Sequence, residues 1–109
     1  MIATREYLDE QGNSPYAKGF DSLNAHAAAK VAIAVYRLEQ GNFSNVKGVG
    51  GGVFENRIDF GPGYRIYFGK DGDQLIILVG GGSKKRQQAD IQAAQARWQD
   101  YKQRQRQET

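Results

Sequence analysis

Basic and aromatic side chains recur in the middle of this 109-residue chain, with Arg57 in one short segment and Arg65 and Tyr67 in the next. A guanidinium group stays ionised and can bond two phosphate oxygens at once. A tyrosine ring can stack on an unpaired base. The pattern is therefore compatible with a phosphate contact beside a base-stacking ring. Arg57 opposite Tyr67 could equally form a cation–π pair that only holds two strands together.

A basic run, Lys84, Lys85 and Arg86, follows further along the chain. The first 25 residues, by contrast, carry four acidic residues against two basic ones. This asymmetry, more than the net charge of +3, predicts that the C-terminal half binds an anionic ligand. A solvated surface run remains the alternative for these three residues.

Other catalytic groups are scarce. The chain has no cysteine and a single histidine, His26, so it offers neither thiolate ligands nor a histidine cluster. We therefore expect chemistry without a cofactor or metal, unless carboxylates alone hold one. His26 is expected to be a surface or capping residue. Asp90 could be a general base, but a carboxylate in the first turn of a helix is more commonly a partner of the helix dipole.

Three strand-like runs, 53–60, 64–70 and 74–80, are separated by turn residues at 61–63 and 71–73. They predict a three-stranded antiparallel meander. We expect residue 60 to lie opposite 64 and Phe68 opposite Leu75, which divides the side chains between two faces.

One face of this meander is predicted to be apolar and to form the core. It comprises Phe54, Ile58, Phe60, Tyr64, Ile66 and Phe68. The other face is predicted to be open and to carry Glu55, Arg57, Asp59, Arg65 and Tyr67, with Ile76 and Leu78 beside them.

The flanking segments predict a strand, helices and a glycine-rich loop. Residues 2–8 resemble a strand, and Ser14-Pro15 begins a short helix that runs to about residue 22. Asn24 caps a second helix that ends at Gly41, and residues 42–52 form the loop. The apolar stripe of this second helix is Ala27, Val31, Val35 and Leu38. A last helix begins near Gln87, with the stripe Ile91, Ala94, Trp98 and Tyr101.

Composition fits one α+β domain over residues 1–103, followed by a mobile basic tail at 104–109. Hydrophobic residues make up 39% of the chain and charged residues 25%, the balance of a folded soluble domain. The longest apolar run, Leu75 to Val79, is too short to cross a bilayer, and no export signal is recognisable. We expect a cytoplasmic protein without a membrane partner.

The segment E-N-R-I-D-F-G-P-G-Y-R-I-Y-F at 55–68, in this order of elements, resembles the RelE/ParE toxins. The likeness is strongest to the branch called addiction-module killer proteins, which is related to HigB. It extends upstream through 37–42 and 46–49 and downstream through G-G-G-S-K-K-R-Q-Q-A-D-I at 80–91. Most of residues 20–98 is covered, and the two main motifs are fairly specific as a pair.

The resemblance implies a RelE-like fold and the toxin role in a type II toxin–antitoxin module. RelE-like members cleave mRNA in the ribosome and so inhibit translation, whereas ParE-like members bind DNA gyrase. In the former a 2′-hydroxyl attacks the adjacent phosphate without a metal. The implied catalytic residues are Arg57, Arg65, Tyr67 and Lys84, and the implied RNA-binding residues are Lys47, Lys85 and Arg86.

Arg65 matches the hairpin arginine that stabilises charge on the attacked phosphate in such nucleases. The alternative is an exposed pair with Asp59 across the hairpin, worth roughly 0.2–1 kcal/mol. Ile76 and Leu78 would leave an apolar patch, which commonly marks a protein interface. We expect a cognate antitoxin with a helix-turn-helix DNA-binding region to cover it, unless the C-terminal helix does so.

Overall fold

The computed structural model describes residues 1–108 and has the α+β class predicted from the sequence. In chain order the elements are β1 (Ala3–Glu6), α1 (Pro15–Asp21), α2 (Ala25–Glu39), β2 (Val46–Gly50), β3 (Val53–Ile58), β4 (Tyr64–Lys70), β5 (Leu75–Ser83), the 3-10 turn η1 (Lys84–Arg86) and α3 (Gln87–Gln107).

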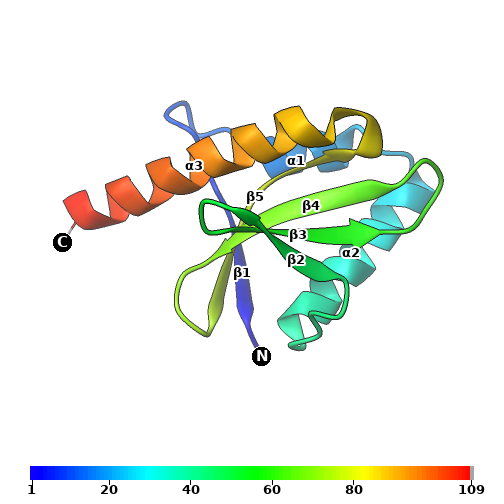
Figure 1. Cartoon of the computed structure of the whole chain (residues 1–109), viewed down its shortest axis with the longest axis horizontal. Coiled ribbons are helices and arrows are strands. Elements are labelled where there is room, and N and C mark those ends of the chain that lie inside the picture. The colour runs from blue at the N-terminus through cyan, green and yellow to red at the C-terminus, as the bar shows by residue number, and fades with distance from the viewer. Residues whose placement is uncertain (109) are drawn as a thin grey trace.

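The five strands form one mixed sheet in the order β1-β5-β4-β3-β2. Strands β2 to β5 make an antiparallel meander, and β1 joins its edge parallel to β5. Helices α1 and α2 pack on one face of the sheet, while the long helix α3 crosses the other (Figure 1). The protein is therefore a three-layer structure with apolar contacts on both faces of the sheet.

The predicted starts of α1 and α2 are confirmed by their N-terminal caps. The Ser14 hydroxyl accepts a hydrogen bond from the Ala17 amide at 3.0 Å, and the Asn24 side chain accepts one from the Ala27 amide at 2.8 Å. Each cap satisfies an amide that the first helical turn leaves without a partner. Gly41 has φ 82°, the left-handed conformation expected just after a helix.

The segment predicted to be a glycine-rich loop contains a strand. Residues 46–50 form β2 and pair with β3, so the meander has four strands rather than three. Gly51 and Gly52, with φ of 65° and 81°, make the turn between them. Glycines weaken the side-chain pattern of a strand but leave its backbone free to pair, which explains why the sequence pattern missed β2.

The core on the α1 and α2 side matches the predicted apolar face of β3 and β4. Val31 and Leu38 of α2 are buried there together with Ile58, Ile66 and Phe68. The hairpin register is shifted by two residues from the expected one and its connection is longer, because Ile58 rather than Phe60 lies opposite Tyr64. An even shift keeps every side chain on its predicted face.

The register between β4 and β5 is wrong in the prediction by an odd number of residues. Phe68 lies opposite Leu78 instead of Leu75, and a bulge interrupts the ladder between Tyr67 and Phe68. Ile76 and Leu78 consequently turn toward α2 and are 1% and 3% exposed. Ile76 and Leu78 therefore form no exposed apolar patch, and the prediction that an antitoxin covers them is wrong.

The face predicted to be open lies under α3. Tyr67, Ile77 and Val79 are buried there against Ala94 and Trp98 of the helix. The predicted stripe of α3 is thereby confirmed, with Ile91 and Tyr101 at its margins. The close approach of α3 to β4 requires glycine at position 69, because a Cβ atom there would clash with the Trp98 indole.

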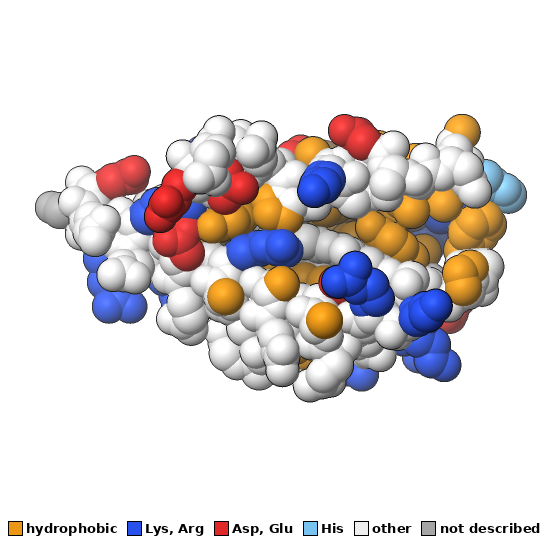
Figure 2. Space-filling model, turned by 90° about the horizontal axis from the view of Figure 1, so that it is seen from above, with side chains coloured by type: hydrophobic (Ala, Val, Ile, Leu, Met, Phe, Trp, Pro, Cys, Tyr) orange, Lys and Arg blue, Asp and Glu red, His pale blue; other side chains and the backbone are white. Residues whose placement is uncertain are grey.

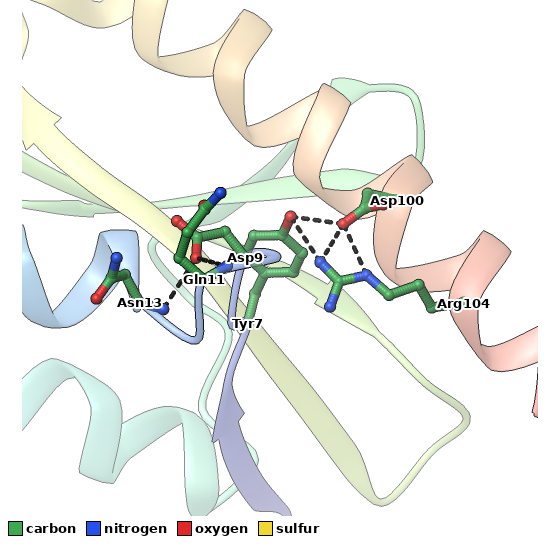
Figure 3. Close-up of polar contacts among 6 residues, drawn as sticks. All are labelled: Tyr7, Asp9, Gln11, Asn13, Asp100 and Arg104. Atoms are coloured by element: carbon green, nitrogen blue, oxygen red, sulfur yellow. Dashed lines mark hydrogen bonds and ion pairs between the residues drawn. The ribbon is translucent and has the colours of Figure 1, made fainter.

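A polar cluster holds the second half of α3 to the end of β1 (Figure 3). The Tyr7 hydroxyl donates to Asp100 at 2.6 Å, and Arg104 donates to Tyr7 at 3.1 Å and forms an ion pair with Asp100. Next to it, Asp9 accepts the amides of residues 11 and 13, which closes the turn toward α1. Residues 104–107, predicted to be part of a mobile tail, are helical, and Thr109 lies outside the described residues.

Replacing Trp98 with alanine should lower the free energy of unfolding by about 3–5 kcal/mol, because a large buried aromatic side chain leaves a cavity between α3 and the sheet. Urea denaturation followed by circular dichroism measures this loss. An unchanged midpoint would show that α3 contributes little to the core.

Gly69→Ala should also destabilise the protein, because the added methyl group meets the Trp98 indole. In the Trp98→Ala background the same substitution should cost clearly less, since the clashing ring is gone. Equal costs of Gly69→Ala in the two backgrounds would contradict the packing of Trp98 on β4.

The Arg104 guanidinium, and next the Tyr7 hydroxyl, hold the pKa of Asp100 below its ordinary value. A carboxyl whose pKa is lowered by folding stabilises the protein above its unfolded pKa and loses that contribution as the pH falls through the folded pKa. The difference in Tm between the wild type and Asp100→Asn should therefore be largest near neutral pH and vanish well below about pH 4. Asp73→Asn, at an exposed turn carboxylate, serves as the matched control. A difference for Asp100→Asn that stays constant with pH would argue against this role.

Candidate functional site

A hollow of about 370 Å³ lies at the end of the sheet, beside the turn between β3 and β4. Arg57, Arg65 and Lys84 line it, so the structure brings together three of the four predicted catalytic residues. Arg57 and Arg65 are directly opposite in the β3–β4 ladder, and Lys84 begins the turn that follows β5. Three cations around one hollow make it suited to an anionic ligand.

Arg65 is the buried member of this group. Its side chain is 10% exposed, and its Nε atom lies 3.6 Å from a carboxylate oxygen of Glu55. The alternative of a pair with Asp59 is wrong, because the shifted register leaves Asp59 in the connection beside Arg57, at 3.4 Å from Nε of Arg57. Among residues 1–108 the Nη1 atom of Arg65 has no hydrogen-bond partner, and it lies near Gly63 in the wall of the hollow.

Glu55 holds this arginine in place and was not among the predicted site residues. Its carboxylate is 1% exposed and accepts a hydrogen bond of 2.9 Å from the Gln87 amide at the start of α3. The Lys47 ammonium lies 3.7 Å away on the solvent side. A buried carboxylate needs such partners, because leaving its charge unpaired would cost several kcal/mol. The sequence pattern gave no signal for this role, because it placed Glu55 on the face of the sheet that was predicted to be open.

Tyr67 does not reach the hollow as a free side chain. It is fully buried below α3, and its neighbour across the ladder is Glu55 rather than Arg57, so the register does not support the alternative of a cation–π pair. Burial, and next the charge of Glu55, raise the pKa of Tyr67 well above its ordinary value. Its ring cannot stack on a base while α3 is in place.

The remaining predicted basic residues surround the hollow at the surface. Lys85 and Arg86 are exposed in η1 next to Lys84, and the side chain of Lys47 is 67% exposed on β2. Seen from the α3 side, Lys and Arg side chains lie beside apolar ones toward the right-hand end of the molecule (Figure 2). The basic character therefore extends beyond the hollow itself.

Asp90 lies close above β5, where a Cβ atom at Gly82 would collide with its carboxylate. Burial raises the pKa of Asp90, while the charges of Arg86 and Arg97 act in the opposite direction. This position near the cationic residues is compatible with either of its predicted roles.

His26 is exposed in the first turn of α2, and its ring lies 4.8 Å from the Phe60 ring between centroids. Its predicted surface position is confirmed, and Asn24 provides the cap.

Within residues 1–108, no three His, Cys, Asp or Glu side chains come together in a way that could hold a metal ion. None of the described helices combines the length and apolar character needed to span a membrane.

The fold and the hollow define a small α+β protein with a basic site at one end of a mixed sheet. No family model matches the chain. It is 45% identical over 71 residues to an uncharacterized protein of Haemophilus influenzae, which covers 65% of this chain and 72% of that relative. The chain belongs to the same family as this relative.

Replacing Arg65 with alanine should destabilise the protein by about 3–5 kcal/mol, because it leaves the buried Glu55 carboxylate without its cationic partner. This differs from the small effect expected of an exposed pair. Combining Arg65→Ala with Glu55→Gln should recover part of the loss, since no buried charge then remains. Denaturant titration of the wild type and these two variants tests this, and wild-type stability of Arg65→Ala would exclude the pair as a structural element.

Proposed function

We propose that this protein is the toxin of a type II toxin–antitoxin module, in the RelE/ParE superfamily and its HigB-related branch. Two findings support the proposal. The segment at 55–68 that resembles these toxins forms the β3–β4 hairpin, and the segment at 80–91 forms the junction from β5 through η1 to α3. Both segments line or border the same hollow. The proposed fold is accordingly RelE-like, with β2 added to the expected meander.

The proposed activity is ribosome-dependent cleavage of mRNA, and the observation that carries it is the convergence of Arg57, Arg65 and Lys84 on one hollow. In this reaction the 2′-oxygen forms a bond to the adjacent phosphorus and loses its proton. The bond from phosphorus to the 5′-oxygen breaks, which leaves a 2′,3′-cyclic phosphate and a 5′-hydroxyl group that has gained a proton. Extra negative charge develops on the phosphate oxygens, where cationic donors stabilise the transition state.

The three cations would have different roles. Arg65 is held by Glu55, so its guanidinium is oriented before RNA arrives and loses little freedom on binding. Arg57 and Lys84 are more exposed and would contact the phosphate from either side. Lys47, Lys85 and Arg86 would bind the RNA around the hollow. Tyr67, buried beside Glu55 in the sheet, would not touch the RNA.

One observation favours a second candidate function. With Tyr67 buried, none of the tyrosines among residues 1–108 lines the hollow, and tyrosine side chains assist catalysis in the nucleases that this chain resembles. A ParE-like protein that inhibits DNA gyrase by binding alone would need none. In either case we propose a cytoplasmic protein whose partners are a cognate antitoxin with a helix-turn-helix DNA-binding region and either the ribosome with its mRNA or gyrase.

Lys84→Ala and Arg57→Ala should each lower the rate of mRNA cleavage by about 10²–10³ in a translating extract, because each removes one donor to the transition state. Both side chains are exposed, so the fold should persist. The matched control is Lys18→Ala on α1, which should cleave as the wild type does. Normal cleavage by both site variants would contradict the proposed site.

Primer extension on translated mRNA and a gyrase supercoiling assay, run with the same protein preparation, separate the two candidates. Cleavage within codons without an effect on gyrase supports the nuclease. Loss of supercoiling with intact mRNA supports the gyrase inhibitor.

A further inference from the structure

A second hollow, of about 270 Å³, lies between α2 and the edge formed by β3 and the segment before β2. It is a neighbour of the first hollow, because Arg57 and Asp59 line both. Lys84 lines the first hollow, and the side of α2 lines the second.

The side of α2 contributes two cations to the second hollow. Lys30 and Arg37 are seven residues apart, or about two helical turns, so they project from the same face. Neither side chain forms an ion pair within the described part of the chain. The one acidic residue in the lining, Asp59, already pairs with Arg57. The charge of Lys30 and Arg37 is thus available to a ligand.

Side-chain amides line the same hollow between the cations. Asn45 precedes β2, and Asn56 lies on β3 and is 5% exposed. An amide both donates and accepts hydrogen bonds, as do the edges of nucleic-acid bases. The side-chain oxygen of Asn42, Oδ1, already accepts hydrogen bonds from Ser44, at 3.1 Å from the backbone amide and at 2.6 Å from the hydroxyl. Asn45 and Asn56 are therefore the better candidates for base contacts.

We propose that this second hollow binds the single-stranded RNA next to the scissile phosphate, with Lys30 and Arg37 on backbone phosphates and Asn45 and Asn56 at a base edge. The inference rests on the proposed function, since it assigns a substrate subsite to the same site. Single-stranded RNA fits better than a duplex, because only unpaired bases can enter a small concave site with their edges free.

The test is fluorescence anisotropy with a labelled 12-nucleotide single-stranded RNA whose 2′-hydroxyls are methylated, so that it cannot be cleaved. Lys30→Gln combined with Arg37→Gln should weaken binding about tenfold or more. It should also reduce the slope of log K against log salt by about 1.4, as expected for two lost phosphate contacts on a single strand. Arg5→Gln combined with Lys18→Gln removes the same two residue types from β1 and α1 and is the matched control.

Asn45→Ala tests the base contact separately, because the side chain is exposed and its loss should not disturb the core. It should change the ranking of affinities for oligo(A), oligo(C), oligo(G) and oligo(U) while leaving the salt slope unchanged. An unaltered ranking would remove Asn45 from the subsite.

The inference is overturned if the Lys30/Arg37 variant binds RNA as the control variant does, if the wild type does not bind the oligonucleotide at low salt, or if a duplex of the same sequence binds as tightly. Mapping of mRNA cleavage tests the proposed function independently. Loss of binding in the Lys30/Arg37 variant, with no cleavage by the wild type, would retain the RNA subsite and reject the nuclease. Cleavage by the wild type, with normal RNA binding by the Lys30/Arg37 variant, would support the nuclease and reject the RNA subsite.

Discussion

The buried carboxylate of Glu55 is the constraint on which the site depends. It lies on β3, pairs with Arg65 on β4 and accepts a hydrogen bond from Gln87 at the start of α3. Removing a carboxylate from water is expensive, so the three elements must meet in one arrangement to satisfy it. The same contacts that hold α3 on the sheet therefore also fix the direction of the arginine that lines the hollow.

Covering both faces of the sheet determines where a ligand can bind. Helix α2 occupies one face and α3 the other, so cationic side chains remain accessible at the strand ends and along the side of α2. The close approach of α3 depends on glycines, since Gly69 lies below Trp98 and Gly82 below Asp90. The last predicted strand ends at residue 80, whereas β5 continues to Ser83, and its Gly80 and Gly82 leave room for Arg97 and Asp90 of α3.

The sequence predicted the local structure well and the long-range pairing less well. Helix caps and apolar stripes are local signals, and they located α1, α2 and α3 within a few residues. Strand register depends on turn length, and the Asp71-Gly72 pair suggested a turn of two residues where the structure has a longer one, with Lys70 opposite Ile76. That odd shift alone moved Ile76 and Leu78 from the predicted surface into the core.

The same limit explains which site residues were found. Arg57 and Arg65 lie on one hairpin, so a short-range pattern placed them together, whereas Lys84 was added by the resemblance to the RelE-like toxins. Tyr67 was placed on an open surface because a sequence pattern shows which side chains share a face of a sheet but not which helix covers that face. Lys30 and Arg37 are on a helix far away in the chain, and only tertiary packing places them beside β3. Their spacing in the sequence shows that they share one face of the helix, but it does not show which element lies opposite that face.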